Sequence, residues 1–61
     1  MKAIVKTKSN YKGLNGQWLQ VSEISGTRVT CIVYSEELNK MVSVDFSISE
    51  VVEFTQMTFK N

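Results

Sequence analysis

The strongest constraint on the fold is a two-residue alternation of apolar and polar side chains between Met41 and Ser47. One parity holds Val42, Val44 and Phe46, and the other holds Ser43 and Asp45. Successive side chains of a β-strand point to opposite faces of the sheet. The alternation therefore predicts a half-buried strand whose apolar set faces a core.

Four further stretches are rich in β-branched and aromatic residues, which favours strands. They are Ala3 to Thr7, Gln17 to Ser25, Arg28 to Tyr34 and Val51 to Phe59. The inward candidates are Val29, Cys31 and Val33 in the third stretch and Val52 and Phe54 in the last. Beyond them, Met57 and Phe59 are expected either to fray from the last strand or to pack across an open end of the folded sheet. In the second stretch the apolar parity changes partway, which predicts a β-bulge or a sharp bend.

Glycine and polar residues mark the connections between these strands. Ser9 to Gly16 is expected to be a loop, in which Gly13 and Gly16 supply positive φ or a close backbone approach. Ser25-Gly26-Thr27 predicts a tight hairpin turn with positive φ at Gly26. Ser35 to Lys40 is expected to be a polar loop.

A short helical turn is expected just before the last strand. Ser47 is followed three residues later by Glu50, which is the spacing of a capping box, and the room left predicts a single 3₁₀ turn. Together these elements predict one all-β domain over residues 1–61, a small and strongly bent antiparallel barrel of five strands. Closure of the barrel would remove the exposed sheet edges.

The length and residue types exclude several classes of function. A chain of 61 residues buries only about 60% of its unfolded surface, so we expect no deep cleft and no enzyme active site. There is no histidine and one cysteine, which excludes a zinc site, and neither a cofactor nor a small-molecule substrate is expected. Cys31 is interpreted as a small buried hydrophobe, the alternative being a reactive thiol.

The same features bear on where the protein acts. A single thiol favours a reducing, cytoplasmic setting, because small secreted domains usually carry several disulfides. The apolar runs are too short to span a bilayer, so no membrane partner is expected. The initial Met1 favours a stand-alone protein over an excised domain.

The charges are unevenly distributed although the net charge is only +1. Residues 1–30 hold five cations and one anion, for a net charge of +4, whereas residues 31–61 carry a net charge of −3. One interpretation is a solvated surface of mixed charge that keeps a small protein soluble. The other is a basic face that contacts phosphates.

Four segments, in their order and spacing, resemble those of a known family. They are Tyr11-Lys12-Gly13-Leu14-Asn15-Gly16, Val21 with the Glu23-Ile24 step, Arg28 to Val33, and Val42 to Ser47 followed by Val51. Over residues 3–54 the chain resembles a KOW domain, the SH3-like barrel of NusG-type transcription factors and several ribosomal proteins. The resemblance implies a five-stranded SH3-like barrel and contacts with RNA or ribonucleoprotein in transcription or translation.

The resemblance also implies that loops at one end of the barrel make the contacts. The candidate loop surface is Tyr11, Lys12, Leu14 and Asn15, and the candidate basic surface adds Lys6, Lys8 and Arg28. Tyr11 either stacks on a partner or folds over the end of the barrel. The acidic pair in the loop Ser35 to Lys40 departs from the family pattern and repels phosphate.

Two functions follow as hypotheses. The first is a non-enzymatic module that binds RNA or ribonucleoprotein through the basic loop. The alternative is a protein-interaction module, self-associating or not, without nucleic-acid binding. Trp18 is interpreted as a packing residue of the core, and the alternative is that its ring serves as a platform for a ligand. The three aromatic residues Tyr11, Trp18 and Tyr34 could form an exposed cluster only if Trp18 and Tyr34 point outward.

Overall fold

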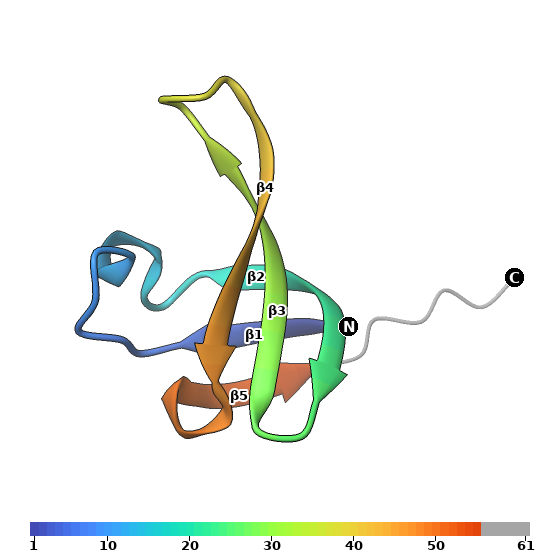
Figure 1. Ribbon diagram of the computed structural model, residues 1–61. Coiled ribbons are helices and arrows are strands. Elements are labelled where there is room, and N and C mark those ends of the chain that lie inside the picture. The colour runs from blue at the N-terminus through green and yellow to red at the C-terminus, as the bar shows by residue number, and fades with distance from the viewer. Residues whose placement is uncertain (56–61) are drawn as a thin grey trace, which may run out of the picture.

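A computed structural model describes residues 1–55 as a single antiparallel sheet of five strands (Figure 1). The strands are β1 (Lys2–Val5), β2 (Trp18–Ser25), β3 (Arg28–Ser35), β4 (Lys40–Ser47) and β5 (Val51–Thr55). Two 3₁₀ turns, η1 (Lys12–Leu14) and η2 (Ile48–Glu50), lie between them. The order across the sheet is β4-β3-β2-β1-β5, so within residues 1–55 β4 and β5 are unpaired edges and the sheet is not closed.

The predicted all-β class and the strands are confirmed, with small shifts at their ends. β1 ends at Val5 rather than Thr7, because the Thr7 backbone is bound by the side chain of Asn15 instead of a neighbouring strand. The extension of the last strand to Phe59, with Met57, falls outside the residues that the structure describes.

The core lies on one face of the curved sheet. Its buried members are Ala3, Val5, Leu19, Val21, Val29, Cys31, Val33, Val44 and Phe46. The period-two prediction is confirmed for β3, where Val29 and Cys31 are fully buried, and for the alternation in β4. Such a core follows from antiparallel strands that bury one face and leave the other to solvent.

The predicted irregularity in β2 is present, and it decides the position of the tryptophan. The register between β2 and β3 shifts between Val21 and Glu23. Leu19 and Val21, which come before this bulge in the chain, face the core. Trp18 has the opposite parity to them, so it points away from the core and is 43% exposed. The interpretation of Trp18 as a core residue is therefore wrong, because one strand segment cannot bury both parities in a single-layer core.

The inward prediction for β5 is also wrong. Val51 pairs with Val5 and Glu53 pairs with Ile4, which leaves Val52 as an extra residue at a bulge, 65% exposed. Phe54 lies opposite Ala3 but remains 39% exposed. β5 is a short edge strand, and its bulge shifts the register after the first residue, so only Val51 packs against the core.

The turns agree with the predictions except at one glycine. Gly26 has a φ of +60° in a two-residue connection between β2 and β3, and Gly16 has a φ of +82°. Gly13 does not have positive φ and lies inside η1 instead. The capping box is confirmed, since the Ser47 N–H donates to Glu50 Oε1 at 2.8 Å and the Ser49 N–H donates to Ser47 Oγ at 3.3 Å.

Candidate functional site

The connection between β1 and β2 is held in place by Asn15. Its side-chain Oδ1 accepts the Thr7 N–H at 2.9 Å, and its Nδ2 donates to the Thr7 carbonyl at 3.0 Å. Thr7 is 4% exposed, so its backbone groups need protein partners. Asn15, predicted to contact a ligand, thus uses its amide to position the loop that carries Tyr11 and Lys12.

A second anchor joins this loop to η2 through Glu50. Thr7 Oγ1 lies 2.5 Å from Glu50 Oε2, and its single hydroxyl proton is donated to that carboxylate. The Ser9 N–H in turn donates to Thr7 Oγ1 at 3.2 Å, and the Lys6 N–H donates to the Glu50 carbonyl at 2.7 Å. The Thr7 hydroxyl, followed by the Ser47 N–H, stabilises the carboxylate and lowers the pKa of Glu50.

The structure divides the candidate loop surface instead of presenting it as one face. The Tyr11 ring packs edge-on against Phe46, with centroids 6.3 Å apart and planes at 74°, yet remains 46% exposed. Leu14 is half-buried against the core, and Lys12 is exposed in η1. Tyr11 and Leu14 therefore face the concave side of the sheet. There the Tyr11 ring lies over the core, which is close to the second of its two predicted roles, folding over the end of the barrel.

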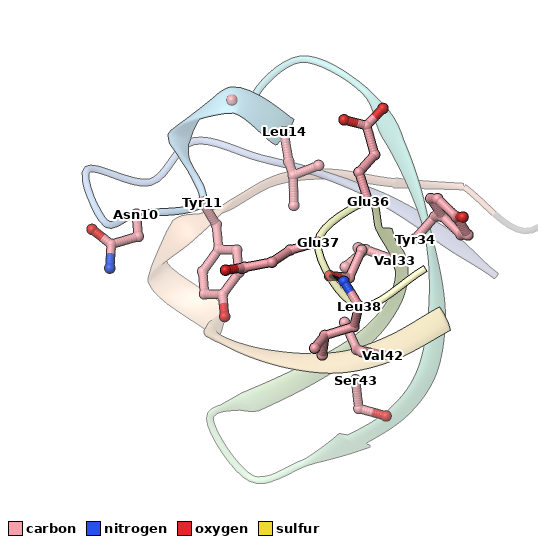
Figure 2. A pocket seen from close by; sticks show the side chains of 12 residues that line it. Asn10, Tyr11, Leu14, Val33, Tyr34, Glu36, Glu37, Leu38, Val42 and Ser43 are labelled. Atoms are coloured by element: carbon pink, nitrogen blue, oxygen red, sulfur yellow. Dashed lines mark hydrogen bonds between the residues drawn. The ribbon is translucent and has the colours of Figure 1, made fainter. Parts of the chain in front are cut away.

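These two residues line a pocket of about 710 Å³, which lies between the loop and the β3–β4 hairpin (Figure 2). The hairpin contributes Val33, Leu38 and Val42 to its wall and Glu36 and Glu37 to its rim. The sequence predicted no deep cleft and did not anticipate this open hollow. That prediction considered only the space inside the core, whereas this hollow lies between the β1–β2 connection and the outer end of the β3–β4 hairpin.

The opposite, outer face of the sheet carries the two exposed aromatic residues that the sequence left ambiguous. The pairing of β2 with β3 ends at Gln20 and Ile32, so Trp18 on β2 and Tyr34 on β3 each lie two residues beyond the last paired residues of these adjacent strands. Trp18 also pairs with Ile4, and Tyr34 is 53% exposed. The Tyr34 hydroxyl is hydrogen-bonded to Asn39 Oδ1 in the hairpin loop, and Figure 2 shows its ring turned away from the pocket.

Three lysines lie on β1, which pairs with the strand of Trp18, and on the residues that follow β1. Lys2 shares a strand face with Ile4, and Lys6 and Lys8, which follow the end of β1, are exposed. Glu53 lies beside Ile4 on β5 as the adjacent anion. We call Trp18, Tyr34, Lys2, Lys6 and Lys8 the outer surface.

Arg28 does not join the other candidate cations. It pairs with Ser25 and Ser47 at the far end of β3, six residues from Tyr34. Thr30 lies between Arg28 and Tyr34 on β3, and it pairs with the anionic residues Glu23 on β2 and Asp45 on β4. Six residues of strand correspond to about 20 Å, so Arg28 is remote from the aromatic pair.

The sequence contained part of the signal for the outer surface. The apolar Leu19 and Val21 have the parity opposite to that of Trp18, and Tyr34 has the parity opposite to that of Val33. Exposure of both aromatic residues follows once the larger apolar sets are assigned to the core. Their placement on neighbouring strands has no local signal, because it depends on how β2 and β3 pair in the sheet.

The remaining chemistry of residues 1–55 is sparse. The buried Cys31 is interpreted correctly, and burial raises the pKa of its thiol. No group of three or more potential metal-ligating side chains occurs among these residues. None of their helical segments has the length and apolar character needed to cross a bilayer. Comparison with known protein families, curated proteins and solved structures finds no match for this chain.

Proposed function

We propose that this protein is a non-enzymatic binding module of the SH3-like, KOW-like type, which binds single-stranded RNA or a ribonucleoprotein in a reducing, cytoplasmic setting. The antiparallel order β4-β3-β2-β1-β5, the two-residue β2–β3 turn and the 3₁₀ turn before β5 support this architecture. Curling of the sheet into a barrel is part of the proposal.

The observation that carries the proposal is the exposure of two large aromatic residues on the outer surface. Trp18 and Tyr34 are 43% and 53% exposed on adjacent strands of one face. Proteins that bind single strands combine such aromatic faces, on which bases stack, with cations that follow the phosphates. Lys2 and Lys6 lie two residues on either side of Ile4, the direct partner of Trp18, so they supply these cations about 7 Å from it along β1.

The chemistry assigns a separate role to each residue type. Trp18 and Tyr34 stack on bases without a sequence preference, because every base has a π face. Lys2, Lys6 and Lys8 contact the phosphates and make the affinity fall with salt. Lys12, which is exposed in η1, is a further candidate for a phosphate contact.

Trp18 is the only tryptophan, so its fluorescence reports the proposed contact directly. Mixed-sequence single-stranded RNA is titrated into the protein at two salt concentrations. We expect quenching of Trp18 emission at low salt. Trp18→Ala, followed with labelled RNA, should lower the affinity about 5- to 150-fold, since stacking of one base contributes about 1–3 kcal/mol.

Two charge variants provide the matched comparison. Lys6→Gln should reduce the slope of log affinity against log salt by about 0.7, the value expected for one phosphate contact on a single strand. Arg28→Gln removes the same charge at the remote end of β3 and should leave the affinity nearly unchanged. Absence of quenching with every RNA and DNA pool at low salt would refute the proposal and leave a protein partner as the alternative.

A further inference from the structure

The pocket on the concave side has a chemistry that the outer surface lacks. Its floor and walls include the Tyr11 ring and the apolar Leu14, Leu38 and Val42, and its rim carries Glu36 and Glu37. No lysine or arginine is among the residues that line it. A pocket of about 710 Å³ lies within the range of known ligand sites, roughly 300–1,000 Å³.

Several apolar side chains of the pocket remain partly or largely exposed, so a ligand could pack against them. Leu38 is 59% exposed although it is large and apolar, and Leu14 and Val42 are half-buried. Figure 2 shows Glu37 extending toward the Tyr11 side of the hollow, with Leu14 and Val42 on other sides. The edge-on contact with Phe46 holds the Tyr11 ring without covering all of it.

We propose that this pocket binds a short peptide segment of a partner protein, in which an arginine or lysine lies next to an apolar side chain. The cation is attracted by Glu36 and Glu37 and by the negative face of the Tyr11 ring. The apolar neighbour packs against Leu14 and Leu38. The two glutamates repel phosphate, so this site is distinct from the proposed RNA surface on the opposite face and does not depend on it.

The loop anchors explain how the site is formed before binding. Asn15 and Glu50 both hold Thr7, which fixes the β1–β2 side of the pocket. On the hairpin side, the Leu38 N–H donates to Ser35 Oγ at 3.1 Å, and Asn39 binds the Tyr34 hydroxyl. A preorganised site loses less conformational entropy when a peptide binds.

The test uses two amidated pentapeptides and backbone amide NMR shifts of the whole chain. One peptide alternates leucine with arginine, and the other has glutamate in place of arginine. We expect the arginine peptide to shift the amides of Tyr11, Leu14 and Leu38, and the glutamate peptide to leave them unchanged. The double variant Glu36→Gln/Glu37→Gln should weaken binding about 2- to 30-fold, at about 0.2–1 kcal/mol for each exposed charge pair.

Glu23→Gln/Glu53→Gln is the matched control, because it removes two negative charges away from the pocket lining. It should weaken binding much less. The inference is overturned if no pocket amide shifts at millimolar arginine peptide, if the glutamate peptide binds equally well, or if the shifts map to Trp18 and Tyr34. Shifts of the pocket amides with protein concentration alone would overturn it in favour of a second copy as the occupant.

Discussion

Replacement of Glu50 by glutamine should destabilise the protein more than any other single charge removal on its described surface. The carboxylate accepts from the Thr7 hydroxyl at 2.5 Å and from the Ser47 N–H at 2.8 Å. It therefore joins the end of β1 to the turn before β5, across 43 residues of sequence. The glutamine of Glu50→Gln keeps the shape but has one acceptor oxygen and no charge.

The magnitude follows from the two hydrogen bonds. A bond to a charged group contributes about 1.5–3 kcal/mol and a neutral one about 0.5–1.5 kcal/mol. Because the carboxylate is partly exposed, we expect a net loss of about 1–2 kcal/mol. A domain of 61 residues has a free energy of unfolding of about 3–9 kcal/mol, so the loss is a large fraction of it and should lower Tm by about 5–15 °C.

The loss of stability in Glu50→Gln should depend on pH. The pKa of Glu50 is lowered in the folded state from 4.5, so its contribution is fully present above that value. It disappears as the pH falls through the lower folded-state pKa, because the carboxylate must then be protonated. Urea unfolding at several pH values should show wild type and Glu50→Gln converging in stability below pH 4.5.

Two comparisons make the reasoning refutable. Glu53→Gln makes the same charge change at an exposed position on β5 and should leave stability nearly unchanged. A double-mutant cycle with Thr7→Val should give a coupling free energy of at least about 0.5 kcal/mol for directly bonded groups. The Glu50 carboxylate does not have this role if Glu50→Gln matches Glu53→Gln in stability, or if the difference from wild type persists unchanged at strongly acidic pH.

Two further predictions concern the loop anchor and the core. Asn15→Ala leaves the Thr7 N–H and carbonyl without their partners and should lower the free energy of unfolding, measured in urea, by about 1–3 kcal/mol. Asn10→Ala, at an exposed loop position, should lower it little, and equal effects of the two variants would contradict the role of Asn15. Cys31 is fully buried with a raised thiol pKa, so a thiol reagent should modify it only through opening of the fold; a rate unaffected by urea would contradict this.

The features that were predicted correctly from the sequence are local in origin. The period-two patterns of β3 and β4 identify Val29, Cys31 and Phe46 as core residues, because alternate side chains of a strand share a face. Ser47 and Glu50 close a capping box within four residues. The features that were missed or wrong, such as the exposure of Trp18 and Val52, depend on bulges and on pairing with other strands.

The sequence by itself therefore determined an all-β chain, its turns and most of its buried face. Only the tertiary structure decided which side chains meet. It left Trp18 and Tyr34 exposed on adjacent strands, joined Thr7 to Glu50, and placed Tyr11 opposite the acidic hairpin. The physical reason is that local alternation specifies the face of each side chain, whereas register and sheet curvature specify its neighbours.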